Sequence, residues 1–190
     1  MNAKRDESQP DAASAAALRA RLTYDDARLL GECDVHLHRT GGPGGQHRNK
    51  VASAVRLVHR PTGFVVTATE RRSQHENRAN AVQRLREAIA VGLRLPLPEQ
   101  VVWPESVQIQ ARGPDAARVT LRVSARNPAV WQVLALALDA LTACRGNIGD
   151  AAACLGVTTS SLTRFLHDHP RAWAEANRLR AAAGLPPLRS

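Results

Sequence analysis

The feature that most constrains this chain is a glycine-rich stretch, RTGGPGGQHRNK, at residues 39–50. Its four glycines and one proline are unsuited to the interior of a regular helix or strand. The run CDVHLHR ends where this stretch begins, and its alternation predicts a half-buried strand with Cys33, Val35 and Leu37 on one face. A strand is therefore expected to lead directly into a long loop.

A hairpin and then a helix are predicted after the loop. The run AVRLVHRPTGFVVTAT has two β-branched segments around RPTG, with Pro61 and Gly63 where a type I turn favours them. Ser73 and Glu76 form a capping box that opens a helix of about twenty residues. The apolar stripe that predicts this helix is Val82, Leu85, Ile89 and Leu93.

These elements predict an α+β fold: a small antiparallel sheet with one long helix packed on it, within residues 18–98. The runs SVQIQAR and RVTLRVSA, separated by GPDA, predict a second hairpin within residues 99–126. Residues 127–190 are expected to be helical. Residues 1–17 contain no continuous apolar run and several acidic residues, so we expect them to be disordered and not a secretion signal.

Two short helices in the C-terminal part have the spacing of a helix-turn-helix. The pattern places a small residue, a left-handed turn glycine and three core contacts at Ala152, Gly156, Val157, Leu162 and Phe165. The second helix then exposes Thr159, Ser160, Thr163, Arg164 and His167. Such a face can contact phosphates or bases, but the same turn also builds packing and protein-binding modules. Both interpretations stay open at this point.

Charge and cysteine content narrow the class of protein. The chain has a net charge of +9, and residues 33–94 carry eleven basic against four acidic residues. This imbalance predicts a polyanionic partner such as nucleic acid, with a merely solvated basic surface as the alternative. Three widely spaced cysteines make no disulfide framework or metal knuckle, and no apolar run approaches the roughly 18 residues of a membrane span. A reducing, cytoplasmic location without membrane insertion is expected.

The chemistry available to the loop is limited. Gly44 and Gly45 allow backbone torsions closed to other residues and a close approach to a ligand. The Gln46 amide cannot act as a base near neutral pH, but its oxygen can hold a water molecule and its backbone N–H can stabilise a developing oxyanion. His36, His38 and His47 lack a carboxylate or cysteine partner, so neither a metal nor another cofactor is expected.

Three segments, GGPGGQHRNK, SAVRLVHRPTG and ERRSQHENRANA, resemble the catalytic domain of class I peptide chain release factors and of ribosome-rescue peptidyl-tRNA hydrolases. The similarity covers roughly residues 33–90. It implies hydrolysis of the ester between nascent peptide and tRNA in the ribosomal peptidyl transferase centre. Gln46 would coordinate the attacking water and stabilise the leaving 3′-oxygen through its backbone amide, and Gly44 and Gly45 would let the loop fit beside the tRNA end. The family glutamine can be N-methylated, which implies a glutamine methyltransferase as a further partner. Gly41 stands where the family often has serine or alanine, and Arg48 stands where it often has valine.

The surroundings of the motif suggest a subtype. Stop-codon-reading factors carry a large codon-recognition domain, normally before this motif, whereas only about 32 residues precede the strand here. Rescue hydrolases end in a Lys/Arg-rich tail, whereas this chain has two lysines, Lys4 and Lys50, and a helix-turn-helix-like unit in the tail's place. We therefore expect stop-codon-independent peptide release or ribosome rescue by a monomer that binds large-subunit rRNA and P-site peptidyl-tRNA.

The alternative function is a non-catalytic RNA- or DNA-binding protein that uses the release-factor-like module for docking. The intact Gly-Gly-Gln favours catalysis, because docking alone does not require two glycines at that point. The residues expected to contact RNA are Arg39, His47, Arg48, Lys50, Arg56, Arg60, Arg71, Arg72 and Arg164.

Overall fold

The computed structural model describes residues 11–39, 53–111, 119–124 and 126–189. The chain divides into two compact units. The first is Ala20–Ala90, and the second combines Met1–Arg19 with Val91–Ser190. Each unit has buried apolar side chains of its own.

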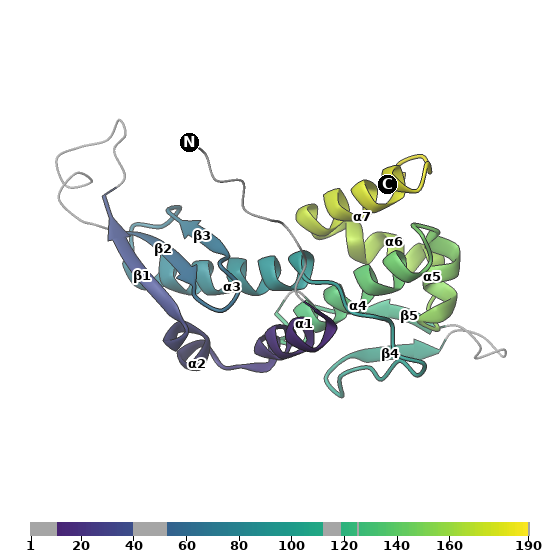
Figure 1. The fold of residues 1–190 in the computed structure, drawn as a ribbon, viewed down its shortest axis with the longest axis horizontal. Coiled ribbons are helices and arrows are strands. Elements are labelled where there is room, and N and C mark those ends of the chain that lie inside the picture. Colours follow the sequence, from purple (N-terminus) through teal and green to yellow (C-terminus); the bar gives the residue numbers. More distant parts are fainter. Residues whose placement is uncertain (1–10, 40–52, 112–118, 125, 190) are drawn as a thin grey trace. The chain divides into compact units, whose positions relative to one another are not determined.

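The first unit is built on a three-stranded antiparallel sheet with the order β1-β2-β3 (Figure 1). The α3 helix is joined to the sheet region by hydrogen bonds from its side chains to the carbonyls of Ser53 and Thr67. The predicted strand, hairpin and helix, and with them the α+β class, are confirmed. The elements are η1 (Ala20–Thr23), α2 (Asp26–Gly31), β1 (Cys33–His38), β2 (Ala54–His59), β3 (Val65–Ala68) and α3 (Gln74–Gly92).

The core of this unit follows from the predicted apolar stripe. Its members Val82, Leu85 and Ile89 are almost fully buried on α3. Burial of one such side chain contributes about 1.5–3 kcal/mol, so α3 is held mainly by this face. The prediction for β1 was less accurate, since Cys33 is buried but Leu37 is 48% exposed. Only the first part of β1 is therefore shielded from solvent. The strands contribute Val55, Leu57, Val66 and Ala68 to the buried set.

Polar side chains join the elements of this unit. The buried Arg86 of α3 donates to Asp26 Oδ1 at 2.5 Å and to the Tyr24 carbonyl at 2.6 Å, which ties α3 to the start of α2. His59 is fully buried at the end of β2, and its ring nitrogens lie 2.7 Å from Thr62 Oγ1 and 3.1 Å from Glu32 Oε2. Each of these buried polar groups thus has the partners that its desolvation requires.

The second unit contains a two-stranded hairpin and five helices in its described residues. The predicted second hairpin and C-terminal helices are confirmed. Strand β5 also pairs with the helix-turn-helix, because Val119 bridges Val157 and the Thr158 N–H donates to the Val119 carbonyl at 3.0 Å. The hairpin is therefore part of the helical unit. The elements are α1 (Ala12–Arg19), β4 (Gln108–Ala111), β5 (Val119–Arg122), α4 (Val130–Ala143), α5 (Ile148–Cys154), α6 (Thr159–His167) and α7 (Pro170–Ala182).

The prediction of disorder over residues 1–17 is wrong for its second part, because α1 begins at Ala12. Residues 1–10 lie outside the described residues. The helix has a local cause: the segment AASAAALR is rich in alanine, the best helix former, and Asp11 Oδ1 accepts from the Ser14 N–H at 2.8 Å as an N-cap does. Ala15 is buried, so packing adds to this local preference.

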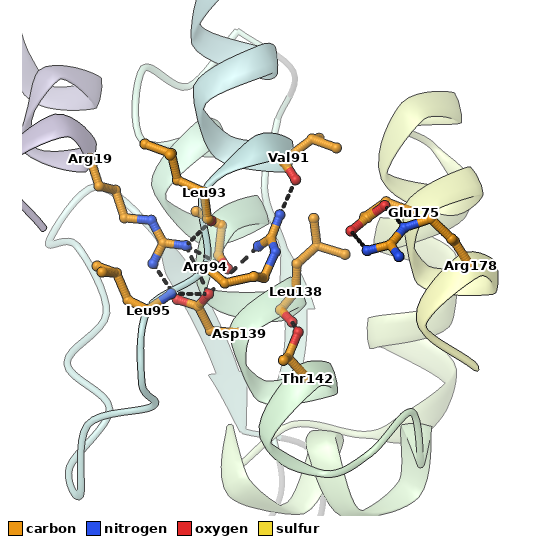
Figure 2. Close-up of polar contacts among 11 residues, drawn as sticks. Arg19, Val91, Leu93, Arg94, Leu95, Leu138, Asp139, Thr142, Glu175 and Arg178 are labelled. Carbon is orange, nitrogen blue, oxygen red and sulfur yellow. Dashed lines mark hydrogen bonds and ion pairs between the residues drawn. The ribbon is translucent and has the colours of Figure 1, made fainter. Parts of the chain in front are cut away.

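A buried carboxylate joins three segments of the second unit. Asp139 of α4 is 2% exposed and receives two hydrogen bonds from Arg19, while Arg94 Nη1 lies 3.6 Å from its Oδ1 (Figure 2). The Leu95 N–H donates to the same oxygen at 3.0 Å, and Arg19 also donates to the Leu93 carbonyl at 3.1 Å. Burial raises the pKa of Asp139, and the two guanidinium groups act against that rise.

The Asp139 cluster explains why residues 91–98 group with the second unit, although we expected them in the first domain. Arg19 and Leu93–Leu95 stand close in sequence to the two points at which the chain passes between the units. Arg19 and the Leu95 N–H both donate to the Asp139 carboxylate of α4, and Arg19 also donates to the Leu93 carbonyl. The residues next to both chain connections are therefore held by one cluster of the second unit.

We predict that Asp139→Ala lowers the free energy of unfolding by about 3–5 kcal/mol, because it leaves two partly buried guanidinium groups without their carboxylate. Urea titration followed by circular dichroism measures this change. The matched control is Glu99→Ala, an exposed carboxylate in the same unit, which should change stability by less than about 0.5 kcal/mol. Equal effects of the two substitutions would contradict this account of the cluster.

The buried His59 predicts a pH dependence of stability. Burial lowers its pKa, although the hydrogen bond to Glu32 acts in the opposite direction. The folded state therefore binds fewer protons than the unfolded chain. Stability present above the unfolded pKa of about 6.5 is lost as the pH falls below it, with a slope of at most about 1.4 kcal/mol per pH unit. Unfolding of wild type and His59→Gln between pH 5 and 8 should show a shallower slope in the variant, and parallel curves would refute the assignment.

Candidate functional site

The glycine-rich loop joins two neighbouring strands of the sheet. In the β1–β2 register Cys33 pairs with His59 and His38 pairs with Ala54, so the last residue of β1 lies opposite the first residue of β2. The sheet therefore brings both ends of the loop together (Figure 1). Residues 40–52 lie outside the described residues, and with them six of the predicted site residues: Gly44, Gly45, Gln46, His47, Arg48 and Lys50.

Asn77 is the functional candidate that sequence reasoning missed. It is fully buried in the first turn of α3, and its Nδ2 donates to the carbonyl of Ser53, the residue between the loop and β2, at 2.7 Å. The same Nδ2 donates to the Arg71 carbonyl at 2.8 Å, and its Oδ1 accepts from the Arg71 N–H at 2.9 Å. One amide thus ties the end of the loop to the segment before α3.

The motif RSQHENR contained a signal for this role. Asn77 stands four and eight residues before Ala81 and Leu85, both fully buried, so it shares the core face of α3. A polar side chain on the core face of an amphipathic helix needs hydrogen-bond partners. Its position could therefore have been recognised, but not the identity of its partners, which come from β2 and the preceding loop.

The described arginines of the first unit differ in their surroundings. Arg39 follows β1 at the start of the loop, and Arg56 lies on β2 opposite His36; all three side chains are exposed. Arg71 and Arg72 are also exposed and adjoin the loop end through Asn77. These exposed cations are thus distributed around the ends of the loop.

Arg60 does not lie near the ends of the loop. It follows His59 at the opposite end of β2 from the loop, roughly 20 Å along the strand at about 3.3 Å per residue. Its guanidinium donates to Asp34 Oδ1 at 2.7 Å and to the Gly31 carbonyl at 2.6 Å. The structure therefore does not bring Arg60 together with the other predicted RNA-contacting residues of this unit.

The helix-turn-helix of the second unit has the predicted geometry. Gly156 has φ +66° at the turn, and Thr158 caps α6 by accepting from the Ser161 N–H at 3.3 Å. Ser160, Arg164 and His167 are exposed on α6, and Thr159 and Thr163 are half-buried. The polar face of α6 is therefore available to a partner. The small residue and core contacts of the pattern are buried: Ala152, Val157, Leu162 and Phe165.

The described residues contain neither a candidate metal site nor a helix that could span a membrane. In that part of the chain, no three His, Cys, Asp or Glu side chains gather as a metal ion would require. His36 and His38 are exposed on β1, and His47 lies outside the described residues. None of the described helices combines the length and apolarity needed to cross a bilayer.

Gly156 supplies a test of the turn. Replacement by alanine should lower the free energy of unfolding by about 1–2 kcal/mol, because an L-residue at φ +66° is strained although nothing lies within 4 Å of the added Cβ. The matched control is Gly149→Ala within α5, where alanine should be neutral or stabilising by up to about 1 kcal/mol. Denaturant unfolding of both variants checks this, and destabilisation by Gly149→Ala alone would contradict it.

Comparison with known proteins matches residues 30–108 to the family described as the RF-1 domain. The peptide chain release factor 1 of Caldicellulosiruptor bescii is 54% identical over 55 residues, which are 29% of this chain and 16% of that protein. That of Acidiphilium cryptum is 56% identical over 52 residues, 27% of this chain and 15% of that protein. That of Lactobacillus delbrueckii subsp. bulgaricus is 48% identical over 58 residues, 30% of this chain and 16% of that protein.

The matched part of the chain thus spans about a sixth of the length of these relatives. The predicted resemblance to the catalytic domain of class I release factors is confirmed for the segment around the glycine-rich loop.

Proposed function

We propose that this chain hydrolyses the peptidyl-tRNA ester on the ribosome, without reading a stop codon, because its residues 30–108 match the RF-1 domain family. The observation that carries the proposal is the intact Gly44-Gly45-Gln46 within this domain, in a loop whose two ends are paired by β1 and β2. The reaction adds water across the ester, releasing the peptide as a carboxylic acid and leaving the tRNA with its free 3′-hydroxyl.

Gln46 acts by position rather than by proton transfer. Its side-chain oxygen orients the attacking water, and its backbone N–H stabilises the departing 3′-oxygen as negative charge develops there. Gly44 and Gly45 admit the tRNA end close to the main chain. An aminoacyl ester is already activated, so positioning worth several kcal/mol suffices once the ribosome supplies the rest of the site. Gln46 is also the residue that a glutamine methyltransferase would modify.

Exposed arginines around the loop ends supply the binding energy for RNA in this proposal. Arg39, Arg56, Arg71 and Arg72 would contact phosphates of rRNA or tRNA, and each contact releases counterions and makes binding salt-dependent. His47, Arg48 and Lys50 would add to this set from the loop itself. Arg60, which is paired with Asp34, would contribute least.

The C-terminal helical unit would determine on which state of the stalled ribosome the protein acts. The support for stop-codon independence is that the three relatives match over only 52–58 residues, while the chain after α3 folds into a hairpin and a helix-turn-helix. Arg164, exposed on α6, would contact rRNA or a ribosome-bound factor. The protein would then act as a cytoplasmic, monomeric rescue factor for stalled ribosomes.

One observation favours a second candidate function, a non-catalytic RNA- or DNA-binding protein. The helix-turn-helix is fully formed and presents an exposed polar face, which is how such units dock on nucleic acid. In that case the release-factor-like domain would bind the ribosome without hydrolysing the ester.

The test is Gln46→Ala in a reconstituted release assay. Purified protein is added to ribosomes that hold peptidyl-tRNA with no mRNA, truncated mRNA, a sense codon or a stop codon in the A site. We expect wild type to release peptide without needing the stop codon, and the variant to lose about 10²–10³-fold in rate by analogy with loss of a positioned polar group. Ribosome binding should persist, since no phosphate contact is lost.

The control substitution is Gln100→Ala, an exposed glutamine outside the loop, which should retain full activity. Unchanged release by Gln46→Ala would sink the catalytic role. Ribosome binding without release by wild type in all four states would support the non-catalytic alternative.

A further inference from the structure

We propose that Asn77 is a positioning residue for peptide release: it sets the point at which the Gly44-Gly45-Gln46 loop returns to β2 and fixes that point relative to the Arg71–Arg72 segment. The inference rests on the proposed function. Asn77 itself contacts neither water nor substrate in this account, and acts only through the backbone that it holds.

The first step is that both the nitrogen and the oxygen of the Asn77 side-chain amide form hydrogen bonds. Both hydrogens of Nδ2 are donated, to the Ser53 carbonyl at 2.7 Å and to the Arg71 carbonyl at 2.8 Å, and Oδ1 accepts from the Arg71 N–H at 2.9 Å. Asn77 is fully buried, so water does not compete for these bonds. Aspartate would keep the acceptor and lose both donors, while glutamine would place its amide one methylene further away.

The second step concerns what these bonds connect. Ser53 is the last residue before β2, and the Ala54 that follows it pairs with His38 at the end of β1. The strand pairing therefore holds both loop ends to each other, and Asn77 holds one of them to α3 and to the Arg71 backbone. The exposed arginines at 71 and 72 and the end of the loop are thus connected through one side chain in the first turn of α3.

The third step is energetic. A displacement of about 1 Å in a group that positions a reactant can cost on the order of 10²-fold in rate, because orientation supplies much of the acceleration. A displaced Ser53 would move the Gln46 loop relative to the arginines that hold the protein on RNA. The expected deficit is therefore in the rate of the bound complex more than in the affinity.

The first test needs no activity. Amide hydrogen exchange of the full chain is compared for wild type, Asn77→Asp and a control, Ile89→Val, in which the fully buried Ile89 near the other end of α3 loses one methyl group. We expect exchange at Ser53 and the first residues of β2 to rise about tenfold in Asn77→Asp beyond any rise in the control, since local opening follows the lost bonds. Asn77→Ser, which keeps a single hydroxyl donor, replaces Asn77→Asp if the latter does not fold. Equal exchange in variant and control would overturn the proposal.

The second test distinguishes a positioning role of Asn77 from a loss of protein stability and from weaker binding to the ribosome. Single-turnover peptide release is measured over a range of protein concentrations for the same variants and for the double variant Arg71→Gln/Arg72→Gln. We expect Asn77→Asp to lower the saturated rate on the order of 10²-fold, Ile89→Val to leave it unchanged, and the double arginine variant to raise only the half-saturating concentration. A saturated rate for Asn77→Asp equal to that of Ile89→Val, or a change only in its half-saturating concentration, would overturn the inference. Absence of release by wild type would defeat the proposed function instead, and the exchange experiment would then decide on Asn77 alone.

Discussion

His38 and Ala54 are paired across the β1–β2 ladder although fifteen residues separate them in sequence. Closing a loop of this length costs conformational entropy, which grows only slowly with loop length and is offset by the ladder and by burial of Val55 and Leu57. The rest of the first unit builds on this pairing, because β3 pairs with β2 and side chains of α3 donate to the carbonyls of Ser53, just before β2, and of Thr67 on β3. The β1–β2 pairing therefore brings the two strand ends that flank the glycine-rich segment next to each other.

Buried polar groups add specificity to a core made mostly of small aliphatic side chains. Asn77, Arg86 and His59 in the first unit and Asp139 in the second are all nearly inaccessible to water, and each has hydrogen-bond partners from other elements. Such bonds contribute little net stability compared with water, but leaving one of these groups unpaired is costly. They therefore favour one arrangement of the segments over alternatives that would bury the same apolar area.

In the proposed function the two units have different roles, ester hydrolysis for the first and recognition of the ribosomal state for the second. In this proposal the domain matched by the release factors supplies the reacting loop between β1 and β2, and Asn77 positions the residue at which that loop ends. The helix-turn-helix unit has its own core, and its hairpin is joined to the turn through Val119 and Val157. The polar face of α6 thus belongs to a unit whose hairpin and helices are packed together, as the proposed recognition of a ribosomal state or a nucleic acid would require.

The amino-acid sequence by itself determined the local elements and the chemistry of the loop. Alternation predicted β1 and both hairpins, the 3.6-residue stripe of α3 predicted a buried face, and Gly156 predicted the helix-turn-helix, because each signal depends on residues close together in the chain. The helix at Ala12–Arg19 is also encoded locally, by the alanines after Asp11, although the acidic residues of this segment and its lack of an apolar run predict disorder. Tertiary structure alone decided that Asn77 meets Ser53, that Asp139 meets both Arg19 and Leu95, and that β5 pairs with the helix-turn-helix. Those contacts join residues between 24 and 120 positions apart, and a partner at that distance is selected by the packing of whole elements, which no local pattern specifies.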